Sequence, residues 1–135
     1  NKGCLEQYAS AAGGARLARK AMEASQKPSV LREVPNVSAK TVFDAYKEGD
    51  EMAIEVVEEF SEYLGRALAA FTCVTDPDVI VLGGGVSRAG QPLIDCVEKY
   101  YRNYAFTACK ETPIRLATLG NDAGVCGAAK LILSQ

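Results

Sequence analysis

Apolar residues recur at helical spacing along most of the chain, so the pattern predicts a largely helical protein. The predicted helices span residues 5–24, 39–48, 51–74, 92–104 and 123–133. Gly13 and Gly14 fall inside the first helix, where they mark either a close neighbour or a break. Arg16, Arg19 and Lys20 lie toward its C-terminal half, where cations suit the helix dipole.

The predicted helix 51–74 has an apolar stripe on one side and glutamates on the other. The stripe follows the helical period and consists of Ala53, Val56, Val57, Phe60, Leu64, Ala67, Leu68 and Phe71. The other side carries Glu51, Glu55, Glu58, Glu59 and Glu62. We expect the stripe to pack against a sheet. The glutamates are typical of a solvated face, with an acidic binding surface as the alternative.

Capping residues predict where several helices begin and end. Ser38 is a good N-cap for the second helix, and Gly49 suits the position after its end. Asp50 then caps the third helix, and Pro92 suits the first turn of the fourth. Residues 25–37 contain prolines and no sustained period, which predicts a loop.

Two segments have the pattern of β-strands. Residues 79–82 are β-favouring and apolar without alternation, which is typical of a strand buried on both faces of a parallel sheet. Residues 114–119 alternate and predict a second strand, so the order of elements indicates an α/β fold. Two strands are few for a free-standing sheet, and the chain does not open on a methionine. We therefore expect a fragment of a longer protein.

Three glycines, Gly83, Gly84 and Gly85, follow the first predicted strand directly. Glycine permits positive φ and leaves no side chain in the way of a ligand. Open α/β sheets bind ligands at the carboxyl ends of their strands, which is where these glycines lie. The same glycines also suit a tight turn without a ligand, and the stretch alone leaves both interpretations open.

Composition excludes several classes of function. The 135 residues are 48% hydrophobic with a net charge of −2, which is typical of one globular domain and gives no basic field for nucleic acid. No apolar run approaches the ~20 residues of a membrane span, so no membrane partner is expected. Tyr100, Tyr101 and Tyr104 are more typical of a core edge or a subunit interface than of a platform for stacking bases.

The numbers of cysteines and histidines limit which disulfides and catalytic sites the chain can form. The five cysteines are scattered without a C-x-x-C spacing, which indicates a reducing cytoplasm rather than a disulfide framework. The chain has no histidine, so a Ser-His-Asp triad or a Cys-His pair cannot form within it.

Three stretches together resemble the ROK family of bacterial sugar kinases and related repressors. They are GCLEQYAS at residues 3–10, PDVIVLGGGVS at 77–87 and LGNDAGVCGAA at 119–129. The first resembles the end of the family's zinc-and-sugar motif, the second its nucleotide loop, and the third the C-terminal block of its glucokinases. The resemblance implies that residues 1–135 are one domain, the helix-rich C-terminal part of an actin/hexokinase-like (ribonuclease H-like) lobe, with the N-terminal lobe absent.

The resemblance also implies binding roles for particular residues. Gly83, Gly84 and Gly85 would approach the adenosine and phosphate end of ATP, which is used with Mg²⁺. Glu6 would contact sugar hydroxyls, since a carboxylate accepts two such bonds at once. Without that context Glu6 is an ordinary first-turn glutamate stabilised by the helix dipole. Cys4 matches the last cysteine of a structural Zn²⁺ site whose other ligands this chain lacks, so we expect zinc in the parent protein and not in the fragment.

The stretch Asn121-Asp122-Ala123 has the letters of the family's catalytic Asp motif but falls in a different block of the sequence. We interpret Asp122 as a helix N-cap near the cleft, and we expect the catalytic base in the absent lobe. The fragment alone is therefore predicted to be inactive.

The leading hypothesis is that the parent protein phosphorylates a hexose, glucose at its 6-hydroxyl, with ATP. The alternatives are the sugar-sensing domain of a ROK-type repressor and an inert scaffold. Intact glycines favour the kinase, because repressors of the family tend to replace them with bulkier residues. The resemblance further implies a homodimer.

Overall fold

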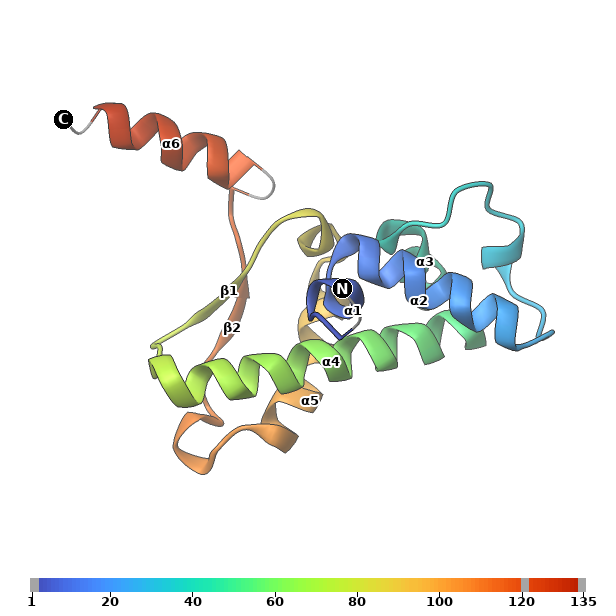
Figure 1. Ribbon diagram of the computed structural model, residues 1–135, viewed down its shortest axis with the longest axis horizontal. Helices are drawn as coiled ribbons and strands as arrows, with labels where there is room; N and C mark the ends of the chain where they lie inside the picture. The colour runs from blue at the N-terminus through green and yellow to red at the C-terminus, as the bar shows by residue number, and fades with distance from the viewer. Residues whose placement is uncertain (1–2, 120–121, 134–135) are drawn as a thin grey trace.

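Helix α4 (Glu51–Thr75) runs along the length of the helical part of the molecule, and four of the other helices pack against it (Figure 1). The computed structural model describes residues 3–119 and 122–133. The remaining elements, in chain order, are α1 (Glu6–Ala9), α2 (Ala11–Ala24), η1 (Val30–Arg32), α3 (Ala39–Lys47), β1 (Ile80–Leu82), η2 (Gly85–Ala89), α5 (Gln91–Tyr104), η3 (Thr107–Cys109), β2 (Ile114–Leu116) and α6 (Ala123–Leu133).

The core lies where α2, α3 and α5 meet α4. Its largest fully buried apolar side chains include Phe60 of α4, Leu93 of α5 and Val42 of α3. The rings of Phe43 and Phe60 meet edge to face at 6.0 Å, which joins α3 to α4. The predicted stripe of α4 faces this core except at its C-terminal end. There Phe71, which we expected to be buried, is 55% exposed.

Helices α4 and α5 approach closely at Gly65. A Cβ on Gly65 would lie 2.7 Å from the Cβ of Tyr100 and 2.8 Å from the backbone nitrogen of Tyr101. Real Cβ atoms do not approach other atoms so closely, so the contact requires glycine at this position. The hydroxyl of buried Tyr101 donates to the carbonyl of Cys109 at 2.5 Å, which ties η3 to α5.

Two glutamates of α4 bind α5, so the expectation of a wholly solvated glutamate face is wrong. Glu58 accepts hydrogen bonds from Lys99 and Tyr100, and Glu62 accepts one from Tyr104 at 2.6 Å. Partial burial opposes ionisation of Glu58, but these hydrogen bonds outweigh burial and lower its pKa. The tyrosines thus form the core edge that the sequence predicted.

The predicted first helix is divided into α1 and α2 at Ser10, whose backbone is extended. Ser10 accepts a hydrogen bond from Gly13 N at 3.0 Å and donates one to Glu6 O at 2.6 Å, so one hydroxyl serves both helices. A Cβ on Gly13 would lie 2.7 Å from the carbonyl carbon of Tyr8. The glycine therefore marks a close neighbour, and the break lies three residues earlier.

The other predicted helix boundaries agree with the structure. Ser38 forms a capping box with Thr41 at the start of α3, and Gly49 after α3 has a φ of +83°. Asp50 caps α4 by accepting from Ala53 N at 2.9 Å. The predicted loop 25–37 contains the short helix η1.

The sheet has two parallel strands, β1 and β2, with Ile80 opposite Ile114. Both strands are shorter than predicted, and the expectation of a strand buried on both faces is wrong. Ile80 joins the helical core at 9% exposure, whereas Val81, on the opposite face, is 57% exposed. The reason is that the described elements cover one face of the sheet only.

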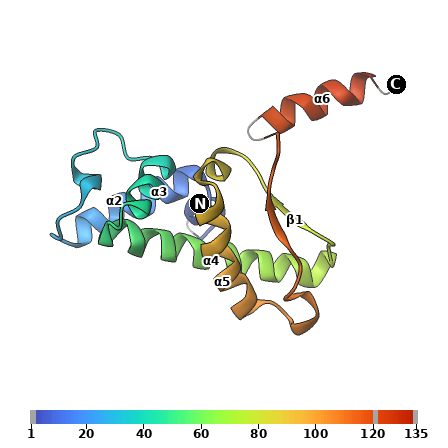
Figure 2. The ribbon, with the colours of Figure 1, turned by 180° about the vertical axis from the view of Figure 1, so that it is seen from behind.

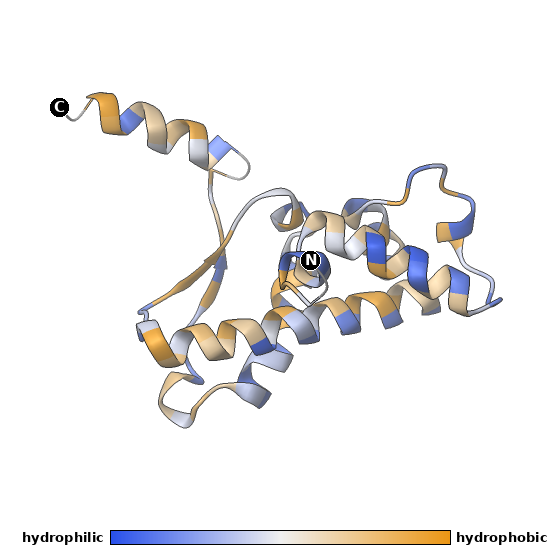
Figure 3. Cartoon of the chain, in the orientation of Figure 1, coloured by the Kyte–Doolittle hydropathy of each residue, from blue (hydrophilic) through white to orange (hydrophobic). Residues whose placement is uncertain are grey.

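Helix α6 lies at the far end of the strands, apart from the helical core, in both views (Figures 1 and 2). It has no buried residue, although it is largely apolar (Figure 3). Among the described residues, no helix is both long and apolar enough to cross a membrane.

The Gly65 contact yields a test of how α4 and α5 pack. We expect Gly65→Ala to lower the free energy of unfolding by roughly 1–3 kcal/mol, because the added methyl group forces the two helices apart. Gly14→Ala is the matched control, since its Cβ would lie 3.5 Å from Ala39 Cβ, an ordinary contact. We expect this control to be neutral or to stabilise by up to ~1 kcal/mol. Urea unfolding measures both changes, and equal effects would contradict the packing argument.

Asp50 yields a pH-dependent test. Its partial burial opposes ionisation, but hydrogen bonds from Ala53 N, Val30 N and the Ser29 hydroxyl prevail and lower its pKa. The stabilisation is therefore present above the carboxyl pKa of the unfolded chain, about 3.9, and is lost as the pH falls through the lower folded value. We expect Asp50→Asn to destabilise the neutral protein by roughly 1–2 kcal/mol.

The difference between wild type and Asp50→Asn should shrink in acid when urea unfolding is followed against pH. Glu51→Gln is the control, because it removes a charge from the same turn without removing a described hydrogen bond. If the difference in free energy of unfolding between wild type and Asp50→Asn did not change with pH, the charge of Asp50 would not contribute to stability.

Candidate functional site

The three-glycine loop leaves β1 with a backbone that only glycine adopts readily. Gly84 has φ +73° and ψ −163°, a region that is essentially closed to residues with a side chain. The Gly84 carbonyl accepts hydrogen bonds from Ser87, from its hydroxyl at 2.8 Å and from its backbone nitrogen at 3.2 Å. These bonds start the short helix η2 and hold the loop in shape.

The surroundings of the three glycines differ. A Cβ on Gly83 would lie 3.4 Å from Ala117 Cβ, beyond the end of β2, and one on Gly85 would lie 3.4 Å from Ala11 Cβ, at the start of α2. A Cβ on Gly84 would meet nothing within 4 Å. The loop is therefore supported on both sides and open at its centre, where a ligand can reach the backbone.

Glu6 is the first residue of α1 and is exposed. Its carboxylate makes no hydrogen bond or ion pair with another residue in the described part of the chain, so both oxygens remain available as acceptors. Beside it is a hollow of about 220 Å³ between α1 and α2. The residues lining this hollow are Glu6, Gln7, Ala12, Gly13, Arg16 and Arg19.

The structure brings the predicted nucleotide loop and the predicted sugar residue to the same region. Gly85 lies next to Ala11, since a Cβ on this glycine would be 3.4 Å from Ala11 Cβ, and Ala11 follows the short helix that Glu6 begins. The ribbon shows η2 beside the start of α2 in both views (Figures 1 and 2). Elements far apart in the sequence thus lie next to each other where α2 begins, with the glycine loop beside Ala11 and α1 directly before it.

Cys4 is exposed and free, just before α1. Across residues 3–119 and 122–133, no three His, Cys, Asp or Glu side chains converge as a metal site. A structural zinc needs four ligands, of which this region supplies Cys4 alone. The described residues therefore do not fit a complete zinc or magnesium site.

Asp122 directly precedes α6 and is exposed, and its role as an N-cap stays a prediction. Its backbone nitrogen donates to the carbonyl of Leu119 at 3.1 Å. The neighbouring residues of the motif, Gly120 and Asn121, lie outside the described residues.

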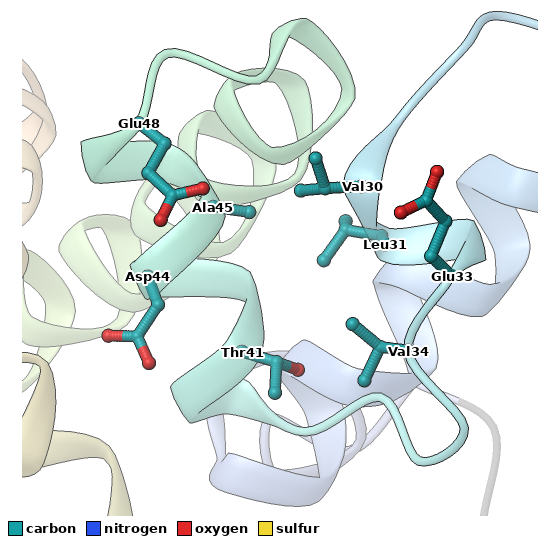
Figure 4. Close-up of a pocket in the computed structure, with 8 residues that line it drawn as sticks. All are labelled: Val30, Leu31, Glu33, Val34, Thr41, Asp44, Ala45 and Glu48. Atoms are coloured by element: carbon teal, nitrogen blue, oxygen red, sulfur yellow. The ribbon is translucent and has the colours of Figure 1, made fainter.

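A second hollow, of about 300 Å³, lies between η1 and α3 (Figure 4). Its apolar side is formed by Val30, Leu31 and Val34. Its carboxylates include Asp44, which is paired with Lys40, and this hydrogen bond lowers the Asp44 pKa. The hollow contains none of the residues that the sequence singled out, and its side chains offer no group suited to phosphate.

Sequence reasoning missed the part that Arg16 plays near the site. We expected Arg16 to interact with the helix dipole, but it donates to the side chain of Gln7 at 2.9 Å and lies over the ring of Tyr8. The sequence could have indicated this role only if the break at Ser10 were known, because that break turns α1 back toward the side of α2 that carries Arg16.

Comparison with known proteins matches residues 1–135 to the ROK family model. The chain is 37% identical to a glucokinase from Halalkalibacterium halodurans over 98% of this chain and 42% of that protein. It is 32% identical to an N-acetyl-D-glucosamine kinase from Haemophilus influenzae over 100% of this chain and 40% of that protein. The chain thus spans about two fifths of the length of these relatives.

Solved structures agree with the sequence match. The fold is similar to a ROK family glucokinase from Streptomyces griseus in complex with glucose and AMPPNP, with a TM-score of 0.86, 29% identity, and coverage of 97% of this chain and 45% of that one. A ROK family transcriptional regulator, a homologue of the E. coli MLC protein, gives a TM-score of 0.74 at 26% identity, covering 86% of this chain and 29% of that one.

These likenesses confirm the predicted fold class, the helix-rich part of an actin/hexokinase-like lobe as sugar kinases of this type have it. Because the family model covers every residue and the relatives match almost the whole chain, the chain belongs to the ROK family.

Proposed function

We propose that the protein containing this chain phosphorylates a hexose with ATP. The observation that carries the proposal is the loop Gly83–Gly85, which is open at Gly84 and lies next to Ala11, at the start of the helix that follows the one bearing Glu6. The similarity to a glucokinase over nearly the whole chain supports it. So does the structural likeness to a kinase bound to glucose and an ATP analogue.

In this proposal the glycine loop binds the nucleotide. The absence of side chains at Gly83, Gly84 and Gly85 lets the adenosine and phosphate end of ATP lie against the backbone. Glu6 accepts hydrogen bonds from sugar hydroxyls, which orients the sugar relative to the nucleotide. Transfer then requires the attacking hydroxyl to lie in line with the γ-phosphate.

Other parts of the reaction are assigned to the rest of the parent protein. We expect the general base there, and also the ligands for Mg²⁺ and the remaining ligands of a zinc site that Cys4 completes. Mg²⁺ would neutralise charge on the transferring phosphoryl group. This chain alone is expected not to catalyse transfer.

Glucose is the substrate we propose, because the identity to the glucokinase, 37%, exceeds that to the N-acetyl-D-glucosamine kinase, 32%.

We also propose a cytoplasmic homodimer. The free cysteines support a reducing compartment, since Cys96 and Cys109 are buried as thiols. The homodimer rests on the family resemblance.

A sugar-sensing repressor is the second candidate, favoured by the structural likeness to a ROK transcriptional regulator. The open Gly84 argues for the kinase, because a sensor that uses no ATP has no need of an unobstructed glycine loop. Hexose- and ATP-dependent phosphorylation by the parent protein tests the choice. Operator binding without turnover on any common hexose would overturn the kinase.

The nucleotide role of the loop is tested by Gly84→Val in the parent protein. The side chain obstructs the open face, and the backbone strain costs about 1–3 kcal/mol, so we expect the KM for ATP to rise about tenfold or more. The KM for hexose should change little. Gly90→Val is the matched control, because Gly90 has nearly the same backbone angles, φ +77° and ψ −150°, outside the loop. An equal KM for ATP in the two variants would contradict a role of the loop in nucleotide binding.

The sugar role of Glu6 is tested by Glu6→Gln. Hydrogen bonds to a charged acceptor are worth about 1.5–3 kcal/mol, so we expect the KM for hexose to rise about tenfold or more while the KM for ATP is nearly unchanged. Glu23→Gln, an exposed glutamate of α2, is the control and should leave both constants alone. A parallel loss of sugar and ATP binding would instead identify Glu6 as a structural residue of α1.

A further inference from the structure

Helix α1, which carries Glu6, has little to fix it in place by itself. It is four residues long, contains no buried residue, and has no side-chain cap at its start. So short a helix is unstable in isolation, since helix formation has a costly nucleus. Its position, and that of the Glu6 carboxylate, therefore depends on contacts with neighbouring elements.

Several of those contacts come from the two residues that follow Glu6, and Arg16 of α2 engages both. Arg16 Nη1 donates to Gln7 Oε1 at 2.9 Å. The Arg16 guanidinium carbon lies 5.6 Å from the centre of the Tyr8 ring, within the range of a cation–π interaction. Tyr8 in turn packs on Tyr63 of α4, with ring centres 4.6 Å apart, so α1 is held by Arg16 from α2 and by Tyr63 from α4.

Arg16 does not form an ion pair with Glu6, and this also bears on the role of the arginine. Arg16 and Glu6 line the same hollow, yet the structure pairs the guanidinium with a neutral amide and an aromatic ring. An ion pair between them would occupy the carboxylate and compete with sugar hydroxyls. The arrangement instead holds the backbone of α1 and leaves the oxygens of Glu6 unpaired.

We propose that Arg16 is a positioning residue for sugar binding, one that acts by holding α1 so that Glu6 faces its ligand. The inference rests on the proposed role of Glu6. Arg16 does not touch the sugar. It reduces the conformational freedom that α1 would otherwise lose when a sugar binds. Its effect therefore falls on affinity for hexose and spares the ATP loop.

The test is steady-state kinetics of the full-length parent protein with glucose and ATP. We expect Arg16→Ala to raise the KM for glucose about fivefold, the equivalent of one hydrogen bond, with kcat and the KM for ATP nearly unchanged. Lys20→Ala is the matched control. It removes a cation from the same helix, but Lys20 is exposed and makes no hydrogen bond or ion pair with another described residue. Equal effects of the two variants would overturn the inference.

A double-mutant cycle with Glu6→Gln separates positioning from a general loss of stability. If Arg16 acts through Glu6, Arg16→Ala should have little further effect on the KM for glucose in the Glu6→Gln background. Full additivity would overturn the inference. Failure of the proposed function is distinguishable, because then Glu6→Gln alone would leave the KM for glucose unchanged.

Gln7→Leu keeps the proposal testable should Arg16→Ala fail to fold. The leucine preserves the bulk of the side chain and removes the acceptor that Arg16 uses. We expect a smaller rise in the KM for glucose of the same kind, about two- to fivefold, again without an effect on ATP. No change in the KM for glucose would contradict the proposal.

Discussion

The close crossing of α4 and α5 at Gly65 fixes the rest of the molecule. Helix α4 leads into β1, and α5 leads through η3 into β2, so the angle and depth of this one contact determine where both strands begin. Hydrogen bonds from Lys99 and Tyr100 to Glu58 lie on one side of the crossing, and the Tyr101 bond to Cys109 lies on the other. Both strands of the parallel pair, and the glycine loop at the end of β1, are thus connected to helices that this crossing holds together.

Local chemistry made much of this fold predictable. The helix boundaries at Ser38, Gly49 and Asp50 depend on side-chain caps and a positive φ within a few residues, and all three agree with the structure. The division of the first helix was missed although Ser10 is a good N-cap, because the apolar pattern continues through it. Burial was less predictable. Phe71 and Val81 are exposed because burial depends on what packs against a face, and the described elements leave those faces uncovered.

The candidate site was predictable as a set of residues and not as an arrangement. The resemblance assigned Gly84 and Glu6 to two different ligands, but neither spacing nor composition indicated that Ala11, shortly after Glu6, would lie next to Gly85. The contribution of Arg16 was hidden for a similar reason. Its partners, Gln7 and Tyr8, are on a helix that exists as a separate element only because the chain turns at Ser10.

The double hydrogen bond of Ser10 has a mechanical consequence. One hydroxyl closes α1 through Glu6 O and opens α2 through Gly13 N, so a rotation of either helix about the junction strains a hydrogen bond of the other. The shared hydroxyl couples the facing ends of the two helices, while the direction of α1 still depends on the side-chain contacts of Gln7 and Tyr8.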